Sequence, residues 1–503
     1  MIVERLHVIQ DRHGYLPDAE LRAFARESGT PLYRIQEVAS YFPHFRQDWD
    51  RPAAVEVKVC RDMSCHLAGS GDLLHPKTGL KEIAKDGVVV GTSCLGRCDR
   101  APACSISRHV HGDEVKTFHD RVYAGLSAGQ LKATVAAIAR GEDPPATPDR
   151  AHLGCDPAAW VIDVYRDGEF PPYEATRRFL KAHPLPIRPG RPPKLDLPDA
   201  EVEKHKKRHA DEHNKALHPF LWQLQQSNLL GMGGAGMPVY QKWFDVWQGA
   251  GSEKYVVCNG DESEPGTFKD RELLLRAPHL VVEGVLLGVL MTGGSAGFIY
   301  IRHEYPEQID ACRAEIERGE AELAEAFGLA GRAFPPIEVF VSPGGYICGE
   351  QSALIEAMED RRAQPRNRPP ELQSNGLRDR PTAVNNVETL AWVPSVVLHG
   401  GDWYAKQGRP GCKGRRFFSI SGDVQKPGVF EVPIGTSLGE LIDLAGRVRP
   451  GRALKAVATS GPSGGFVPAQ LPIQPGVEAR LEKALPKLRD PAEGDFLKKF
   501  VRA

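Results

Sequence analysis

Four cysteines in two closely spaced pairs constrain this chain more than any other feature of its sequence. Cys60 and Cys65 are separated by four residues, and Cys94 and Cys98 by three. Each pair lies where a loop should follow a strand, so the four thiolates can converge on one point and ligate a [2Fe–2S] cluster. Structural zinc is the competing occupant, but zinc sites usually contain a C-x₂-C pair, which is absent here. Four unrelated core cysteines are a third alternative, which the small and polar neighbours of both pairs disfavour.

Length and charge exclude several classes of protein. A chain of 503 residues is too long for one core and suggests about three or four domains. The formal net charge is -1, without long blocks of one sign. The sequence therefore gives no support to nucleic-acid binding or to electrostatic docking on a membrane.

Hydropathy and the first residues indicate where the chain resides. The longest apolar run, at 279–290, is interrupted by Glu283 and is too short to span a bilayer, so we expect a buried helix and no direct membrane insertion. The stretch Met1–Gln10 contains charges and no long apolar core, which predicts that there is no secretory signal. We therefore expect a cytoplasmic protein whose cysteines are reduced.

Helix and strand patterns predict a multidomain α/β fold. Residues 1–140 have the pattern of a compact α/β unit, and Ser127 with Gln130 has the spacing of a capping box. Residues 141–218 are dense in proline and charge, which is typical of a linker with short helices. The elements expected in these two segments are helices at 18–27, 31–40, 127–139 and 173–182, and strands at 54–59 and 88–90.

A larger domain follows at 219–410, where helices, strands and glycine turns alternate as in a three-layer α/β fold. Residues 411–470 are β-rich and include an amphipathic helix at 437–446. The charged and proline-rich residues 471–503 are expected to form a tail. The strands expected in the β-rich unit are 417–421 and 429–432, on either side of Lys426-Pro427-Gly428.

Three segments of the 219–410 domain indicate a second kind of site. Glycines at 231–236, before Pro238 and Lys242, let a backbone approach a flat ring or a phosphate beside a helix N-terminus. The strand from Tyr255 runs into an acidic turn whose amide and carboxylate groups can bond hydroxyls and ring edges, although a solvated turn is the alternative. In the third segment Gly349 and Glu350 begin a helix that runs to about Asp360, and downstream Asn386 is suited to cap a helix at 387–397.

The first domain resembles the thioredoxin-like [2Fe–2S] subunit of complex I. The resemblance rests on the C-x₄-C and C-x₃-C pairs and on Gly-Arg-Cys-Asp-Arg-Ala-Pro around Cys98, and it extends from Gly14 to the helix near Leu131. It implies a thioredoxin-like ferredoxin fold, with the four paired cysteines as metal ligands. Cys104 is expected to be structural, at the start of a strand.

The three segments of the larger domain together resemble the NADH-binding flavoprotein subunit of complex I and the matching subunits of NAD-linked formate dehydrogenases and hydrogenases. The resemblance covers about 219–411, and the β-rich unit after it resembles that family's SLBB domain, a ubiquitin-like β-grasp fold. It implies an oxidoreductase that exchanges electrons between NAD(H), FMN and the [2Fe–2S] cluster, with other subunits as partners. Glu264 is implied as catalytic. The implied FMN contacts are Gly231, Gly233, Gly234, Lys242, Asn259, Asp261, Glu262, Ser263, Tyr346, Gly349, Glu350, Asn385, Asn386 and Thr389.

Departures from the family pattern lie on the nucleotide side of the flavin. Met237 and Glu371 stand where the family has aromatic residues that stack on adenine, and Gln351 replaces a glutamate. Losing the stacking would weaken NADH binding by roughly 1–3 kcal/mol. The alternative function is therefore a non-enzymatic FMN and [2Fe–2S] electron-transfer module that receives electrons from a protein partner. A scaffold with decayed sites is a third hypothesis, which the intact cysteine and glycine motifs oppose. No cysteine follows Cys412, so the family's C-x₂-C-x₂-C motif for a [4Fe–4S] cluster does not occur in this sequence.

Overall fold

The computed structural model describes residues 1–50, 52–76, 79–84, 87–109, 118–148, 154, 156–184, 186 and 218–469, and the structural statements that follow concern these residues. Most of the charged half of the expected linker and all of the expected tail lie outside this part of the chain.

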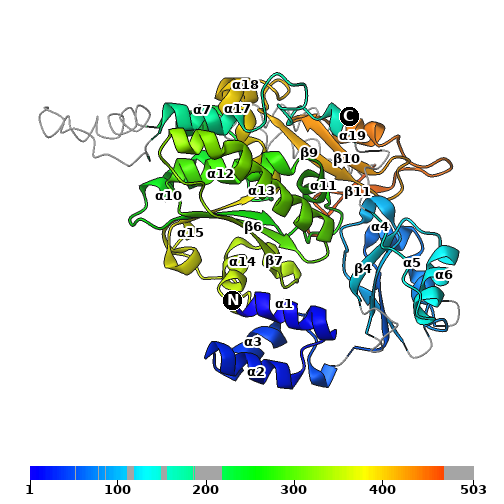
Figure 1. Cartoon of the computed structure of the whole chain (residues 1–503). Helices are drawn as coiled ribbons and strands as arrows, with labels where there is room; N and C mark the ends of the chain where they lie inside the picture. Colours follow the sequence, from blue (N-terminus) through cyan, green and yellow to red (C-terminus); the bar gives the residue numbers. More distant parts are fainter. Residues whose placement is uncertain are drawn as a thin grey trace, which may run out of the picture.

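A four-stranded parallel sheet, ordered β7-β6-β5-β8, forms the centre of the molecule (Figure 1). In its register Val257 pairs with Phe298 on one side and with Val384 on the other. Parallel strands end at the same edge of a sheet, and in open α/β sheets ligands bind at that carboxyl edge. The strands are β5 Tyr255–Gly260, β6 Ala296–Arg302, β7 Ile337–Ser342 and β8 Thr382–Asn386.

Helices cover both faces of this sheet, as a three-layer fold requires. Successive side chains of a strand point to opposite faces, so Val256 and Cys258 join one apolar cluster while Tyr255 and Val257 join the other. The long helix α12 is buried over nearly its whole length, as the apolar run predicted. The helices beside the first cluster are α9 Pro219–Ser227, α10 Val239–Gln248, α11 Lys269–Arg276, α12 Pro278–Thr292 and α13 Pro306–Leu329, together with α16 Val387–Ala391, α17 Val393–His399 and α18 Gly401–Ala405.

One predicted helix is broken in two. The sequence predicted a single helix over 387–397, but α16 ends before Trp392 and α17 begins at Val393. Pro394, in the first turn of α17, has no N–H to donate to the preceding turn, which explains the break. The predicted cap is confirmed, because the Asn386 side chain accepts a hydrogen bond from the Glu388 amide.

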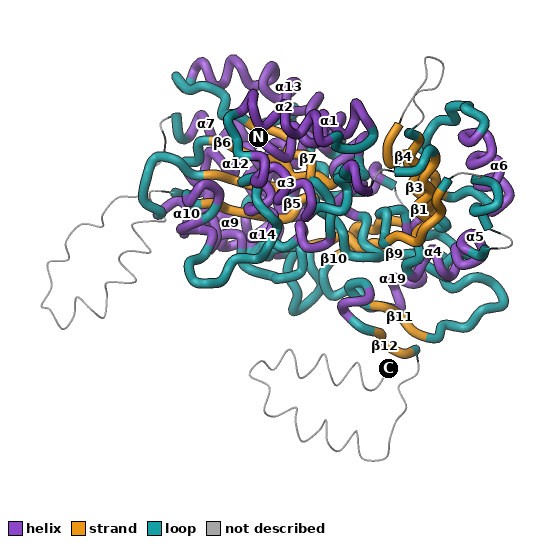
Figure 2. Tube along the Cα trace, turned by 90° about the horizontal axis from the view of Figure 1, so that it is seen from below, coloured by secondary structure: helices purple, strands orange, loops and turns teal. Residues whose placement is uncertain are grey.

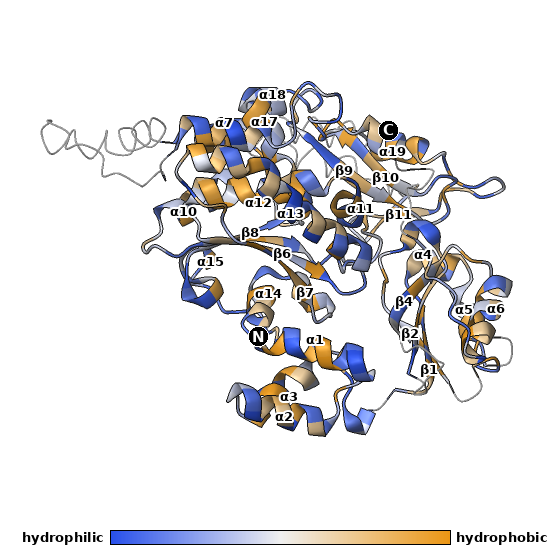
Figure 3. Ribbon diagram, in the orientation of Figure 1, coloured by the Kyte–Doolittle hydropathy of each residue, from blue (hydrophilic) through white to orange (hydrophobic). Residues whose placement is uncertain are grey.

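The second face of the sheet is covered partly by the beginning of the chain. Helices α1 Ile2–His13, α2 Asp18–Ser28 and α3 Leu32–Tyr41 share an apolar cluster with the sheet and with α14 Gln351–Met358 and α15 Leu372–Asn375. They carry hydrophilic and hydrophobic residues on different faces (Figure 3). Residues 1–140 were expected to form one compact unit, but their first forty or so residues pack on the central domain instead.

The elements from β1 to α6 form a separate domain beside these helices, called the ferredoxin domain below because of the resemblance of its sequence. It has its own four-stranded sheet, ordered β2-β1-β3-β4, in which β1 and β2 are parallel and the other pairs antiparallel. The predicted capping box is present, since Ser127 accepts from the Gln130 amide and Gln130 caps Ser127 in return. The elements are β1 Val55–Cys60, α4 Met63–Leu67, α5 Ser70–Leu74, β2 Val88–Thr92, β3 Ala103–Arg108, β4 Phe118–Ala124 and α6 Ala128–Ala139.

Part of the expected linker belongs to the core of the central domain. Trp160, Tyr173 and Phe179 are buried in the cluster that contains α12, and α7 Glu174–Ala182 lies among them. Burial of three large side chains stabilises this segment on the domain, which a solvated linker would not achieve. The described residues 156–184 are therefore packed on the central domain and do not form a solvated linker.

The SLBB unit forms the remaining part of the structure, close to the ferredoxin domain in two perpendicular views (Figures 1 and 2). A side-chain hydrogen bond of 2.8 Å joins Ser64 of α4 to Ser421. Its elements are β9 Arg415–Ile420, β10 Gly428–Pro433, α19 Leu438–Leu444, β11 Ala456–Ala458 and β12 Phe466–Pro468.

No single described helix is both long and apolar enough to cross a membrane. Helices α11 and α12 reach that length and composition only together, across a bend of 92°.

Candidate functional site

The four paired cysteines converge, as their spacing predicted. All four are at most 5% exposed, and the sulfur atoms of Cys94 and Cys98 lie 3.3 Å apart. Cys60 is in hydrogen-bonding contact with both Cys65 and Cys94, so the two pairs form one group. A buried group of four thiols suits a multiply charged metal centre, which compensates the charge of the thiolates.

Backbone amides favour the ionised form of one of these cysteines. Hydrogen bonds with Cys60 and Cys98 lower the pKa of Cys94 well below 9.0, and the amides of Gly96 and Gly266 act in the same direction. Gly266 belongs to the acidic turn after β5, only two residues beyond Glu264. The turn of the flavin domain thus reaches the sulfur atoms of the ferredoxin domain directly.

Two buried arginines of the central domain hold the loop that carries Cys94 and Cys98. Arg302, at the end of β6, donates to the Cys94 carbonyl at 3.1 Å. Arg271, in α11, donates to the Gly96 carbonyl and forms two hydrogen bonds of 3.0 and 2.8 Å with the Asp99 carboxylate. Paired N–H donors of one guanidinium fix a carboxylate in orientation as well as distance. The pair Cys94 and Cys98 is therefore held against the central domain, which is the predicted flavin domain.

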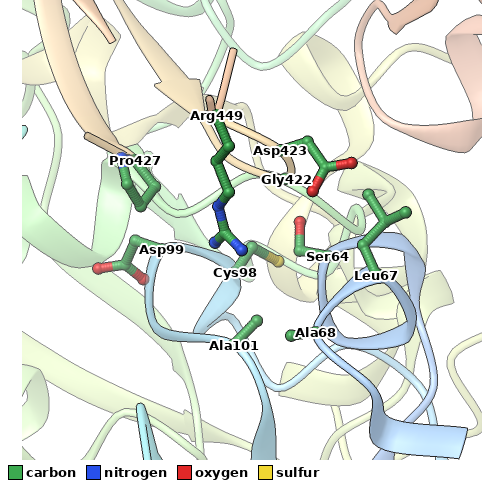
Figure 4. Close-up of a pocket in the computed structure, with 10 residues that line it drawn as sticks. All are labelled: Ser64, Leu67, Ala68, Cys98, Asp99, Ala101, Gly422, Asp423, Pro427 and Arg449. Carbon is green, nitrogen blue, oxygen red and sulfur yellow. The ribbon is translucent and has the colours of Figure 1, made fainter. Parts of the chain in front are cut away.

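The SLBB unit covers another side of the same cysteines. A cavity of about 30 Å³ separates α4 and Cys98 from the turn at Gly422 and Asp423, and it is large enough for a water molecule (Figure 4). The guanidinium of Arg449 extends into this space toward Cys98 and Asp99 (Figure 4). A positive charge at this place favours the more negative, reduced state of a cluster.

The glycine loop at 231–236 and the end of β8 form one wall of the second predicted site, the flavin site. A Cβ on Gly233 would lie 3.2 Å from the Cβ of Asn386, and Gly234 has φ of 115°, which side chains rarely adopt. The Met232 amide donates to the Thr389 hydroxyl at 2.8 Å, which fastens the loop to α16. The loop thus presents bare backbone at the carboxyl edge of the sheet.

The end of β5 forms the floor of the predicted flavin site. Asn259 donates to the Gly349 carbonyl at 2.9 Å, which joins the second and third predicted segments. Asp261 accepts from Ser263 and Ser342, and burial raises its pKa to about 6. Four separate segments, at 231–238, 259–263, 346–350 and 385–389, therefore meet at the carboxyl edge of one sheet.

Some predicted contact residues have their side chains engaged elsewhere. The Glu262 carboxylate accepts from the Asp270 and Arg271 amides at 2.8 and 3.0 Å, which caps α11. The Glu350 carboxylate caps α14 in the same way. The Asn385 amide oxygen accepts from the Trp243 indole at 2.9 Å. These side chains position the walls of the site.

Lys242 has a buried ammonium group without an anionic partner in the described part of the chain. It donates to the Val384 carbonyl at 2.6 Å, and no carboxylate lies within ion-pair distance of it there. Burial lowers its pKa to about 8, with a contribution from the charge of Arg368. Such a group fits the phosphate of FMN, which would compensate its charge beside the glycine loop.

On the side of the flavin site where the nucleotide is expected, the carboxylate of Glu264 already has hydrogen-bond partners. Glu264 accepts from the Tyr346 hydroxyl on one oxygen and from Ser463, in the β11–β12 connection, on the other at 2.6 Å. The SLBB unit therefore contacts the residue implied as catalytic. Tyr346 is 61% exposed, so its ring is accessible from solvent.

Arg368 connects two of the three positions that depart from the family pattern. It pairs with Glu350 at 2.8 Å, and lies 3.8 Å from Glu371. In the orientation that satisfies its amide, the Gln351 oxygen accepts from Arg368 at 2.8 and 3.1 Å. A charged network thus occupies the region where the family pattern has aromatic residues.

Sequence reasoning missed the residues that join the two sites. Arg271, Asp99, Gly266, Arg302 and Ser463 were not predicted to have a role. The sequence does contain one signal, four consecutive charged residues at 269–272. The structure shows that all four are buried, which charged side chains rarely are unless they are paired. They are Lys269, Asp270, Arg271 and Glu272.

Comparisons with known proteins agree with both sites. Residues 1–125 match the thioredoxin-like [2Fe–2S] ferredoxin family, residues 224–395 the Nuo51 FMN-binding domain, and residues 417–467 the SLBB domain. The chain thus combines a flavin domain, an iron–sulfur domain and an SLBB domain.

The NAD-reducing hydrogenase HoxS subunit alpha of Cupriavidus necator is 32% identical over 92% of this chain and 72% of that protein. An NADH-quinone oxidoreductase subunit of Rhizobium meliloti is 41% identical over 49% of this chain, and the match spans 59% of that protein. A crystal structure of an NAD⁺-reducing [NiFe]-hydrogenase in the air-oxidized state superposes with a TM-score of 0.72 at 28% identity, covering 93% of this chain and 73% of that one. The chain belongs to the family of FMN- and [2Fe–2S]-binding oxidoreductase subunits that contains these relatives.

Proposed function

We propose that this chain is the flavoprotein subunit of a multi-subunit oxidoreductase, in which it exchanges electrons between NAD(H) and a [2Fe–2S] cluster through FMN. FMN, when bound, supplies the exchange between two-electron and one-electron carriers. The observation that carries the proposal is the direct contact between the flavin domain and the cluster loop, which Arg271 of α11 and Arg302 of β6 make by hydrogen bonds to Gly96, Asp99 and Cys94. These residues hold the two sites in a fixed relation.

The proposed roles follow from the geometry. Lys242 holds the phosphate end of the flavin, the bare backbone of the glycine loop admits it, and Asn259 and Asp261 bond its polar groups. Cys60, Cys65, Cys94 and Cys98 ligate the iron. Glu264 faces the nucleotide. We also place the chain in the cytoplasm, because none of the nine described cysteines forms a disulfide.

Replacing Lys242 with methionine is expected to weaken FMN binding by about 10- to 100-fold. Removing a charge-assisted hydrogen bond costs about 1.5–3 kcal/mol, and 1.4 kcal/mol is a factor of ten in Kd. The measurement is a fluorescence titration of the flavin-free chain with FMN. Lys254 provides a matched control, since it is also buried, donates to a backbone carbonyl and has a pKa lowered to about 8. Equal affinities for the K242M and K254M variants would refute this role.

The activity is tested with flavin-loaded, iron-loaded protein under anaerobic conditions. NADH is expected to bleach the flavin absorption and to support reduction of a dye. Glu264→Gln removes the charge but keeps the shape of the side chain, so it should lower the rate while flavin content stays unchanged. Fully flavinated wild-type protein that shows neither bleaching nor dye reduction would reject NADH as the donor.

One observation favours a second candidate function, the electron-transfer module that receives electrons from a protein partner. Glu264 is already engaged by Tyr346 and Ser463, and Arg368 forms a charged network with Glu350. On this hypothesis NADH leaves the flavin oxidised, whereas a reduced ferredoxin or dithionite reduces it. The same anaerobic titration therefore separates the two functions.

A further inference from the structure

Two histidines and an aspartate that belong to neither predicted cofactor site meet where three parts of the molecule join. His44 lies in the turn after α3, Asp120 in β4 of the ferredoxin domain, and His303 directly after β6. One ligand atom from each of them lies within 4.8 Å of the other two. Both imidazoles face the same carboxylate oxygen, Oδ2 of Asp120, at 3.3 Å for His44 Nδ1 and 3.7 Å for His303 Nε2.

The other oxygen of this carboxylate is fully used. Oδ1 of Asp120 accepts from Lys58 Nζ at 3.1 Å and from the Ser105 hydroxyl at 3.0 Å. The carboxylate is therefore fixed from the ferredoxin side, and its second oxygen is directed at the two rings. Because Oδ1 is used in this way, Oδ2 of Asp120 is the one oxygen ligand available to the two imidazole nitrogens.

The imidazoles lack the hydrogen bonds that buried polar atoms normally make. In the described part of the chain, Nδ1 of His44, the nitrogen that faces Asp120, makes no hydrogen bond although the His44 side chain is only 7% exposed. Nδ1 of His303 also makes none, but it faces Glu304 and is not the nitrogen directed at Asp120. Buried nitrogens without hydrogen bonds are uncommon and call for an occupant.

We infer that His44, Asp120 and His303 bind one divalent transition-metal ion of the Zn²⁺ class. Zinc takes nitrogen and oxygen ligands at about 2.0–2.2 Å in a tetrahedron, which places neighbouring ligand atoms roughly 3.3–3.5 Å apart. The two nitrogen-to-oxygen distances are close to this spacing. Magnesium and calcium are disfavoured, because they prefer oxygen ligands.

The surroundings of His303 match those of metal-binding histidines. Its Nδ1 lies 3.5 Å from the Glu304 carboxylate, and a carboxylate behind a ligating imidazole fixes the ring and raises its basicity. His303 also follows Arg302, which holds the Cys94 carbonyl. A metal here joins the helical segment, the ferredoxin sheet and the flavin domain beside the cluster loop, so its role is structural.

The test uses the full chain loaded with FMN and iron, treated with a chelator, incubated with zinc chloride and freed of excess metal by gel filtration. Elemental analysis is expected to find about one zinc per chain in addition to the iron, and X-ray absorption at the zinc edge should show nitrogen and oxygen ligands only. The same treatment should raise the midpoint of thermal unfolding.

Two variants and a control make this result specific. His44→Gln and His303→Gln are each expected to lose the zinc, whereas His279→Gln, which removes a histidine paired with a single aspartate at 3.1 Å, should retain it. His44 lies outside both the ferredoxin sheet and the central sheet, so we expect the H44Q variant to fold. It therefore tests zinc binding even if the H303Q variant does not fold. Sulfur ligands at the zinc edge, no retained zinc in the wild type, or unchanged zinc in H44Q would each overturn the inference.

Discussion

Replacing Cys94 with alanine is expected to remove the iron–sulfur cluster while leaving the flavin bound. Cys94 lies at the centre of the four thiols, in contact with both Cys60 and Cys98, so its loss leaves three ligands for a cluster that needs four. We expect iron and acid-labile sulfide to fall nearly to background, with FMN content close to that of the wild type.

A cysteine outside the group provides the control. Cys412 is only partly buried and lies in the segment before β9, so Cys412→Ala should retain full iron content. Iron content that is undiminished in C94A, or equally diminished in C412A, would contradict the assignment of the ligands. Iron and flavin are measured in the same samples, so a general failure to fold is recognised by loss of both.

Replacing Arg271 with methionine is expected to destabilise the chain by about 3–5 kcal/mol, because it removes the two short hydrogen bonds to the buried carboxylate of Asp99 and leaves Arg100, at 3.4 Å, as a more distant partner. The side chains of Arg271 and Asp99 are at most 2% exposed, so water cannot take the place of the lost hydrogen bonds. The change should appear as a lower midpoint of thermal unfolding and as faster loss of iron on dilution, since the same arginine holds the loop between Cys94 and Cys98.

Asp99→Asn added to R271M should recover part of the lost stability, because the buried charge of Asp99 is then removed while Glu272, the other buried partner of Arg271, keeps its charge. The exposed Arg313 on α13 serves as the control, and Arg313→Gln should change stability by about 0.5 kcal/mol or less. An R271M variant that unfolds and loses iron like R313Q would show that this arginine does not fasten the two domains.

Local patterns in the sequence predicted the parts of each site but not their connection. The two cysteine pairs, the glycine loop and the caps at Ser127 and Asn386 depend on residues close together in the chain, and the structure has them in place. Arg271 and Asp99 are 172 positions apart, and nothing in either local sequence indicates that they meet.

The packing of amphipathic segments was the other feature that sequence alone could not predict. The pattern of α1 shows that one face is buried but not which surface covers it, and its partner proved to be the central sheet. Likewise, the proline and charge of 141–218 were interpreted as a linker, although Trp160 and Phe179 within it are buried in the central domain. When residues far away in the sequence cover the apolar side chains of a segment, the sequence of that segment alone does not show it.

The most direct test of the account is electron transfer within one chain. After a brief light pulse that adds one electron to anaerobic, fully loaded protein, the absorption of the flavin and of the cluster is followed at several protein concentrations. We predict that the electron redistributes between the two at a rate that does not depend on protein concentration, and that C94A shows no such phase. A rate proportional to concentration, or no redistribution in the wild type, would contradict the claim that this fold holds the two sites in electronic contact.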